Sequence, residues 1–320
     1  MKKIYIFISL FLIFNLFALI QILNLKNKHQ IYLRNLMFSE IIADSTLTNE
    51  RELDIIINKK INKNKENLLP YLDQTTVNEL NFAKNQYKGS DSDRFLAISI
   101  LKYLGENPSG LICGLPSLGK VVFDVKKGQG CCSDYSKAWM FYAIYLGLQV
   151  REVNSLNHTT VEFYDSNLKK WVWLDPYNRI QFSMNNELLN QYEARKATLF
   201  DKVTIINFNN DKSNQDLENY EGYNTSQLAL LLWRKGTNFI EVEKWDAKLR
   251  KLKLSKPIRQ LIVLTTGISS GWIILTNDAL ASYLRILKLA IYLLITTYVL
   301  INLFLISKIF FIIKQSKQAV

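Results

Sequence analysis

Both ends of this chain carry an apolar stretch long enough to cross a lipid bilayer. Ile4–Leu25 contains no charged residue, and Leu289–Ser307 is a second candidate near the other end. A transmembrane helix needs about 20 predominantly apolar residues, so both stretches qualify by length. The region between them is much more polar. The sequence therefore predicts a membrane-anchored protein whose globular part lies between two terminal helices.

The N-terminal stretch has two interpretations, a cleaved signal peptide or a permanent anchor. A signal peptide has a shorter apolar core that ends in a small-x-small cleavage site. This stretch ends in Ala18-Leu-Ile-Gln-Ile-Leu-Asn and offers no such site. We predict an uncleaved anchor, with the cleaved signal as the alternative.

Lysines mark the outer ends of both apolar stretches. Lys2 and Lys3 precede the first, and Lys308, Lys314 and Lys317 follow the second. Because positive flanks prefer the cytoplasm, two spans would leave both termini there. The middle of the chain would then lie outside the cytoplasmic (inner) membrane.

A third apolar stretch, Gln260–Thr276, complicates this topology. It is short, and segments of that length more often lie at the membrane interface or in a protein core than cross a bilayer. Seven Lys or Arg residues occur in Lys244–Arg259, just before it. If the stretch did cross, these charges would draw the middle of the chain inward. Two spans are the preferred topology, and three are the alternative.

The apolar segments and the pattern between them divide the chain into six parts. They are an N-terminal membrane anchor (1–25), a helical juxtamembrane region (26–90), a globular core (91–200), a C-terminal extension with the basic stretch (201–259), an interfacial or membrane-associated apolar segment (260–276) and a C-terminal transmembrane helix (284–313).

Hydrophobic periodicity in the core predicts helices that precede strands. Ser92–Gly105 and Cys132–Leu146 have apolar residues at helical spacing, and Gly147 ends the second helix. Val121–Val125 has the composition of a short strand, as does Leu148–Val153. Helices segregated from an antiparallel sheet make the expected fold class α+β.

A hairpin is predicted from two runs rich in β-branched and aromatic residues, Thr160–Tyr164 and Lys170–Leu174. A turn centred on Ser166-Asn167 would place His158 directly opposite Asp175. Opposed residues have Cβ atoms about 4.5–5.5 Å apart, so the carboxylate could accept the imidazole N–H and fix its tautomer.

Cys132 stands at the predicted start of a helix. The helix dipole and the unpaired N–H groups there favour a thiolate, and the same groups could hold an oxyanion. A thiolate nucleophile needs an imidazole partner. Of the two histidines, His29 lies beside the membrane anchor, which leaves His158. We therefore group Cys132, His158 and Asp175 as a candidate catalytic triad; the alternative is that Cys132 merely packs in the core.

The other cysteines do not predict a metal site. Cys131 and Cys132 are adjacent and lack the usual two-residue gap of a zinc ligand pair, and a fourth ligand is missing. Cys131 either pairs with Cys113 in an oxidising compartment or packs in the core, and we expect packing. We expect neither a metal nor a cofactor.

Four blocks of residues, in order, resemble the transglutaminase-like superfamily. They are Gly130-Cys-Cys-Ser-Asp-Tyr-Ser136, Gly147-Leu-Gln-Val-Arg-Glu-Val153, His158-Thr-Thr-Val-Glu-Phe163 and Trp171-Val-Trp-Leu-Asp-Pro176. The resemblance covers residues 93–182. It implies a papain-like core, with a helix that bears the cysteine packed on an antiparallel sheet. It also implies a triad in which Cys132 is the nucleophile, His158 the general acid and base, and Asp175 the residue that orients the imidazole.

The substrate side of such a site has only tentative candidates, namely Gln129, Ser133 and Trp173, as oxyanion or substrate-binding residues. The resemblance implies acyl transfer through a Cys132 thioester. The expected function is a membrane-anchored cysteine peptidase or amidase that acts on a protein or peptide. One alternative is a cross-linking transglutaminase. Another is a non-catalytic membrane scaffold or peptide-binding module with envelope-assembly partners.

The net charge of +12 does not point to nucleic acid. Lys, Asn and Ile are abundant along the whole chain, and no basic-aromatic recognition motif occurs. We therefore expect no nucleic-acid partner, and the membrane and a protein or peptide substrate are the expected partners.

Overall fold

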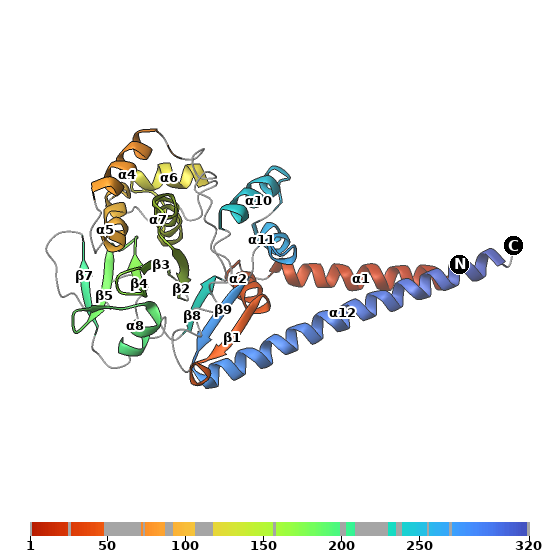
Figure 1. Ribbon diagram of the computed structural model, residues 1–320. Coiled ribbons are helices and arrows are strands. Elements are labelled where there is room, and N and C mark those ends of the chain that lie inside the picture. Colours follow the sequence, from red (N-terminus) through yellow and green to blue (C-terminus); the bar gives the residue numbers. More distant parts are fainter. Residues whose placement is uncertain are drawn as a thin grey trace. The chain divides into compact units, whose positions relative to one another are not determined.

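The computed structural model divides into two compact units (Figure 1). The terminal unit comprises residues 1–39 and 279–320, and the middle unit comprises Glu40–Asp278. The structure describes residues 2–24, 27–47, 72, 74–86, 92–105, 118–155, 158–198, 203–208, 230–234, 239–254, 256–268 and 271–318. The sequence also predicts a charged, Ile-rich surface helix at Thr46–Lys65 and a polar loop at Asn207–Asn224. Most of both segments lies outside the described residues.

The terminal unit is helical. It contains α1 (Lys2–Asn24), α2 (Asn27–Met37) and nearly all of α12 (Asp278–Gln318). The segment of α12 from Asp278 to Gln315 is long and apolar enough to cross a membrane, and it alone meets both criteria among the residues described. The apolar C-terminal helix predicted at 284–313 is therefore confirmed. In α1, the stretch Tyr5–Leu16 forms a shorter apolar helix within the residues described.

The middle unit is built on one nine-stranded sheet with the order β1-β9-β8-β2-β3-β4-β5-β6, and β7 pairs with β5. The strands are β1 (Ser39–Ala43), β2 (Val150–Asn154), β3 (Thr159–Asp165), β4 (Lys170–Asp175), β5 (Ile180–Met184), β6 (Glu187–Leu188), β7 (Thr204–Asn207), β8 (Leu230–Arg234) and β9 (Trp272–Thr276). The pairs from β9 through β8, β2, β3 and β4 to β5 are all antiparallel. The sheet is thus much wider than the hairpin predicted from the sequence.

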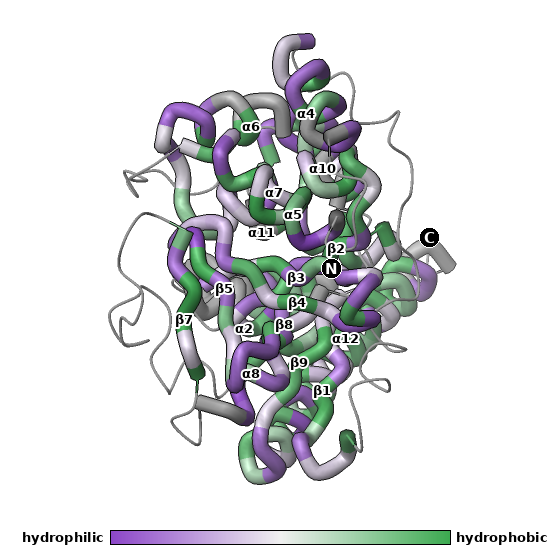
Figure 2. The backbone as a smooth tube through the Cα atoms, turned by 60° about the vertical axis from the view of Figure 1, so that its left-hand side comes forward, coloured by the Kyte–Doolittle hydropathy of each residue, from purple (hydrophilic) through white to green (hydrophobic). Residues whose placement is uncertain are grey.

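The middle unit also contains helices, several of which pack on this sheet, so the predicted α+β class is confirmed. They are α4 (Gln74–Gln86), α5 (Ser92–Ser99), α6 (Leu118–Lys126), α7 (Cys132–Leu146), α8 (Gln191–Thr198), α10 (Phe239–Lys251) and α11 (Lys256–Thr265), with 3-10 turns η1 (Asp44–Thr46) and η3 (Ile100–Tyr103). Figures 1 and 2 place α4, α5, α6 and α7 on the same side of the sheet. Their apolar side chains share one hydrophobic cluster with Val161, Phe163, Val172 and Leu174 of β3 and β4. A second cluster contains Trp173, Phe182 and Trp233.

Both ends of α7 are fixed by local chemistry, as the sequence predicted. Cys131 is extended, and its N–H donates to Asp134 Oδ2 at 3.2 Å, which caps the helix at Cys132. At the other end Gly147 has a φ of 95°, a left-handed conformation that glycine adopts without strain. From Asp134 onward nearly every residue of α7 is buried, so the helix is a central element of the core.

The β3–β4 hairpin differs from the prediction by two residues in register. Asp165 pairs with Lys170, which leaves a four-residue turn rather than a turn centred on Ser166-Asn167. The Asp165 carboxylate stabilises the longer turn, because its Oδ1 accepts the N–H groups of Asn167 and Leu168 at 2.9 and 3.0 Å. Side chains alternate between the faces of a strand, so a shift by two leaves each one on its predicted face.

Two further segments differ from their sequence predictions. Val121–Val125, expected as a strand, lies in α6. Its buried valines 121, 122 and 125 fall on one helical face that packs into the core, and such packing overrides the β-propensity of valine. The predicted helix Ser92–Gly105 is shorter, since α5 ends at Ser99 and continues as the η3 turn.

The C-terminal part of the middle unit contributes a strand to the interior of the sheet. The apolar segment Gln260–Thr276, expected at the membrane interface, contains the end of α11 and the whole of β9, whose five residues are all buried. The basic stretch before it forms α10 and the start of α11. Asp246 of α10 forms ion pairs with Arg250 of the same helix and with Arg259 of α11, each at 2.8 Å, and the second pair joins the two helices. The juxtamembrane region predicted as helical (26–90) likewise contributes a strand, β1.

Candidate active site

Cys132 is the first residue of α7 and carries a free, half-buried thiol. The first N–H groups of a helix have no acceptor within the helix, and those of Cys132 and Ser133 have none among the residues described. The next two, on Asp134 and Tyr135, donate to the Cys131 carbonyl at 2.8 and 3.0 Å. Two open donors and the positive end of the helix dipole are therefore next to Cys132, where they can stabilise negative charge that develops on a bound carbonyl.

His158 lies in the short loop between β2 and β3, and Asp175 is the last residue of β4. His158 Nε2 and Asp175 Oδ2 are 2.7 Å apart, and the two residues are 3% and 0% exposed. Ser155 fixes the loop, because its N–H donates to the His158 carbonyl at 2.8 Å. Asp175 follows Leu174, the partner of Val161, so His158 reaches it diagonally rather than from the directly opposed position that the sequence predicted.

The imidazole also contacts the Cys132 thiol. Burial disfavours the charged imidazole and by itself would lower the pKa of His158. The charge and hydrogen bond of Asp175, followed by the hydrogen bond and charge of Cys132, outweigh burial and raise the pKa to about 10. Because Nε2 is bonded to Asp175, Nδ1 is the ring nitrogen left for the thiol. The predicted residues Cys132, His158 and Asp175 thus form one continuous chain of contacts.

Asp175 is held by more donors than the sequence suggested. Its Oδ1 accepts the N–H groups of Tyr177 and Asn178 at 2.9 and 3.1 Å, and its Oδ2 accepts the Asn178 side-chain amide at 2.7 Å. Sequence reasoning missed Asn178. The signal was available, because a carboxylate followed two and three residues later by its own N–H donors is a common turn arrangement.

Two tyrosines form an aromatic wall beside the imidazole. The Tyr177 ring meets His158 edge-on with 6.1 Å between ring centroids, and it meets Tyr135 in the same way at 5.4 Å. The Tyr135 hydroxyl donates to the Gly105 carbonyl at 3.1 Å. Burial and the neighbouring Tyr177 raise the pKa of Tyr135 to about 12, against the opposing charge of Arg179. Tyr135 is therefore a neutral donor that braces the wall.

The three tentative substrate residues occupy different environments. Ser133 adjoins Cys132 in the first turn of α7, and its Oγ lies 3.5 Å from Cys131 Sγ. Gln129 is exposed just before the helix. Trp173 is 0% exposed and stacks on Phe182 at a centroid distance of 3.9 Å. Its place in the second hydrophobic cluster leaves Trp173 no surface for a substrate.

Cys131 differs from its expected role. It is buried, as the packing interpretation required, but it is also disulfide-bonded. Its partner lies outside the described residues, as does Cys113, the candidate that the sequence offered. The disulfide leaves Cys132 as the free thiol among the described cysteines, so the two adjacent residues have different chemistry.

A buried ion pair supports the strands behind the site. Arg151 Nε donates to Glu162 Oε2, which also accepts the indole N–H of Trp233 at 3.3 Å. The other oxygen of Glu162 accepts the Gln191 N–H at 2.7 Å, and the Arg151 guanidinium stacks over Trp171 at 4.2 Å. Glu162 thereby ties β2, β3, β8 and α8 together. Because Arg151 and Glu162 are buried and fully engaged with these partners, we interpret the pair as a structural element of the sheet.

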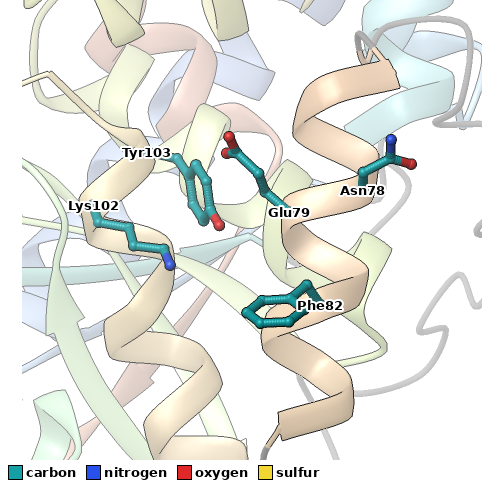
Figure 3. Close-up of a pocket in the computed structure, with 5 residues that line it drawn as sticks. All are labelled: Asn78, Glu79, Phe82, Lys102 and Tyr103. Atoms are coloured by element: carbon teal, nitrogen blue, oxygen red, sulfur yellow. The ribbon is translucent and has the colours of Figure 1, made fainter.

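A hollow on the surface lies away from Cys132, between α4 and η3 (Figure 3). It is lined by Asn78, Glu79, Phe82, Lys102 and Tyr103. Tyr103 packs against Tyr142 of α7, with ring centroids 6.0 Å apart. Tyr142 is ten residues after Cys132 in that helix, which is about 15 Å at 1.5 Å per residue. The hollow is therefore separate from the thiol.

Comparisons of the chain with known protein families, with curated proteins and with solved structures found no significant match. A half-buried thiol at a helix N-terminus, an imidazole in contact with it and a buried carboxylate behind the imidazole make up the parts of a nucleophilic cysteine site.

Proposed function

We propose that the middle unit is a transglutaminase-like cysteine enzyme that transfers acyl groups through a thioester on Cys132. The observation that carries this proposal is the 2.7 Å contact between His158 and Asp175, with the Cys132 thiol on the other side of the same imidazole. The block pattern of the sequence supports the superfamily assignment. The α7 helix packed on β3 and β4 is the arrangement which that resemblance implies.

The first half-reaction forms the thioester. Cys132 Sγ bonds to the carbonyl carbon of an amide while the proton of the Cys132–His158 pair is held on His158, whose pKa is raised. The carbonyl oxygen gains negative charge, and the open N–H groups of Cys132 and Ser133 are placed to donate to it. When the C–N bond breaks, His158 gives its proton to the departing amine. Asp175 keeps the imidazole oriented and stabilises its charged form throughout.

The second half-reaction releases the acyl group. A water molecule gives a proton to His158 while its oxygen bonds to the thioester carbon. The C–S bond then breaks, and the Cys132–His158 pair is left with its one proton as at the start. The net reaction is hydrolysis of an amide or peptide bond, so we propose a peptidase or amidase. If a substrate amine replaced water, the product would be a cross-link. Incorporation of a primary amine probe into protein substrates distinguishes these outcomes.

We also propose that the enzyme works outside the cytoplasmic membrane. The Cys131 disulfide supports this placement, because disulfides persist in oxidising compartments and are rare in the cytosol. The lysines beyond the two terminal apolar stretches support it as well. A reporter fused after Val320 should report a cytoplasmic C-terminus. An external C-terminus combined with a cytoplasmic N-terminus would contradict the two-span topology.

The catalytic proposal is tested by the reactivity of Cys132 toward a thiol-directed electrophile in the full-length protein. His158→Ala should slow labelling about a hundredfold, the scale of a lost general base. His29→Ala is the matched control and should label like the wild type, and Cys132→Ser should not label. Equal and slow labelling of wild type and His158→Ala would favour the non-catalytic scaffold instead.

A further inference from the structure

An asparagine interrupts the apolar helix α1 near its middle. Asn15 stands between two runs of five apolar residues, Leu10–Phe14 and Leu16–Ile20. The whole stretch Ile4–Leu25 contains four polar uncharged residues other than tyrosine, namely Ser9, Asn15, Gln21 and Asn24. An amide in hydrocarbon must find partners, because an unsatisfied polar group there costs several kcal/mol. The position of Asn15 therefore requires an explanation.

Asn15 finds its partners on α12. Its Nδ2 donates to Asn302 Oδ1 at 2.7 Å and to the carbonyl of Phe11 in its own helix at 2.8 Å. Its Oδ1 accepts the Tyr298 hydroxyl. The Asn302 amide in turn donates to the Tyr298 carbonyl at 2.9 Å. Every polar atom of the Asn15 side chain is thus engaged, and two of its three contacts are between the helices.

An aromatic contact adds to these hydrogen bonds. Phe14, the neighbour of Asn15, stacks on the Tyr298 ring with centroids 5.2 Å apart and an angle of 25° between the planes. Nearer the start of α12, the Tyr292 hydroxyl donates to the Met37 carbonyl at 2.6 Å. The two helices run side by side, and the two chain ends lie at the same end of the pair (Figure 1).

The contact between α1 and α12 also lies where the sequence predicts the midpoints of the two membrane-spanning stretches. The midpoint of Ile4–Leu25 falls at residues 14 and 15, and the midpoint of Leu289–Ser307 falls at residue 298. Phe14 and Asn15 meet Tyr298 directly. Two antiparallel helices with aligned midpoints would place their polar contact at the centre of one bilayer, where water cannot replace it.

We propose that Asn15, Tyr298 and Asn302 form a polar clasp inside the membrane. The clasp makes α1 a permanent partner of α12. The mature protein therefore keeps its N-terminal helix and crosses the membrane twice as an antiparallel pair. Interhelical hydrogen bonds of this kind are established contributors to helix association in lipid. A signal peptide that is removed after export has no use for specific partners on the last helix of the same chain.

Cross-linking in native membranes tests the clasp directly. The full-length Asn15→Cys/Asn302→Cys protein is oxidised with copper phenanthroline, and the disulfide-linked peptides are identified by mass spectrometry. The matched control is Ile13→Cys/Asn302→Cys. Ile13 is 63% exposed and lies about 200° around the helix from Asn15, at about 100° per residue. We expect an intramolecular link severalfold more abundant for the Asn15 pair than for the control pair.

Equal yields for the two pairs would overturn the proposal, as would a link found mainly between two copies of the chain. A second measurement needs no substitution in the clasp. The intact mass of the protein isolated from membranes should include residues 2–24, and a mature N-terminus beyond Asn24 would overturn the proposal. Both measurements are independent of Cys132 chemistry, so their outcome does not depend on the proposed enzymatic activity.

Discussion

The Asn178 side-chain amide and the His158 imidazole share one oxygen of Asp175, each at 2.7 Å. The second Asp175 oxygen accepts two backbone N–H groups, from Tyr177 and Asn178. With four donors around it, the carboxylate has little freedom to rotate away from the imidazole. Asn178 is therefore a positioning residue, which acts on His158 through Asp175.

Replacement of Asn178 should weaken the site without abolishing it. Asn178→Ala removes a donor to a charged acceptor, a hydrogen bond worth about 1.5–3 kcal/mol. We expect the rate of Cys132 labelling to fall roughly tenfold, by the usual conversion of about 1.4 kcal/mol per factor of ten, and its pH profile to shift. Asn78→Ala, at an exposed position on α4, is the control. An unchanged rate and profile in Asn178→Ala would show that Asp175 needs no such support.

The raised pKa of His158 predicts how stability depends on pH. The folded pKa of about 10 exceeds the ordinary value of 6.5. Protonated His158 therefore stabilises the folded protein fully below pH 6.5, the ordinary pKa. This stabilisation is lost as the pH rises toward about 10, the pKa in the folded protein. Between about pH 7 and 10 the free energy of unfolding should fall by up to about 1.4 kcal/mol per pH unit. Denaturant unfolding of wild type and His158→Gln, with His29→Gln as control, measures this slope; three identical slopes would contradict the prediction.

The Cys131 disulfide should stabilise the middle unit. Native disulfides typically contribute about 2–4 kcal/mol, so dithiothreitol should lower the thermal midpoint of the wild-type protein measurably. Cys131→Ser should start from the lower midpoint and respond little to the reductant. Cys132→Ser is the matched control and should respond like the wild type. The same midpoint with and without reductant in all three proteins would contradict the prediction.

The Arg151–Glu162 pair should matter for stability rather than for chemistry. Glu162→Gln leaves the buried guanidinium without its counter-charge, a change that typically costs about 3–5 kcal/mol. The exposed substitution Glu187→Gln serves as control and should change the free energy of unfolding by less than about 0.5 kcal/mol. Chemical denaturation monitored by tryptophan fluorescence measures both. A loss of Cys132 labelling without a loss of stability would instead place Glu162 in the site.

Local chemistry explains which parts of the fold could be predicted from the sequence. The start of α7 at Cys132 and its end before Gly147 follow from neighbouring residues, and both are confirmed. The His158–Asp175 contact was predicted correctly although the predicted register was wrong, because a shift by two residues leaves each side chain on the same face of its strand. Asn178 and Tyr177 could have been identified from the turn that follows Asp175, because an Asp side chain commonly accepts the N–H groups of the residues that follow it in a turn.

Long-range pairing explains which parts could not be predicted. The strands β1, β8 and β9 join the sheet from positions far from β2 in the chain. Composition alone marked β9 as an apolar segment without indicating its neighbours. The valines of α6 were misassigned because a β-branched run is equally compatible with one buried face of a helix once the core is known. The disulfide of Cys131 could not be predicted either, because it depends on which cysteine lies near Cys131 in the folded chain.

The neighbouring positions of β1 and β9 set limits on how this protein can be trimmed. These two strands connect in sequence to α2 and α12, and they complete the edge of the sheet beyond β8. A water-soluble fragment must therefore retain Ser39–Ala43 and Trp272–Thr276. A fragment limited to residues 91–200 would leave β2 with an unpaired edge and would uncover apolar side chains that now face Trp233 and Ile273. Such edges recruit other chains, so a fragment of that kind should aggregate even though it contains Cys132, His158 and Asp175.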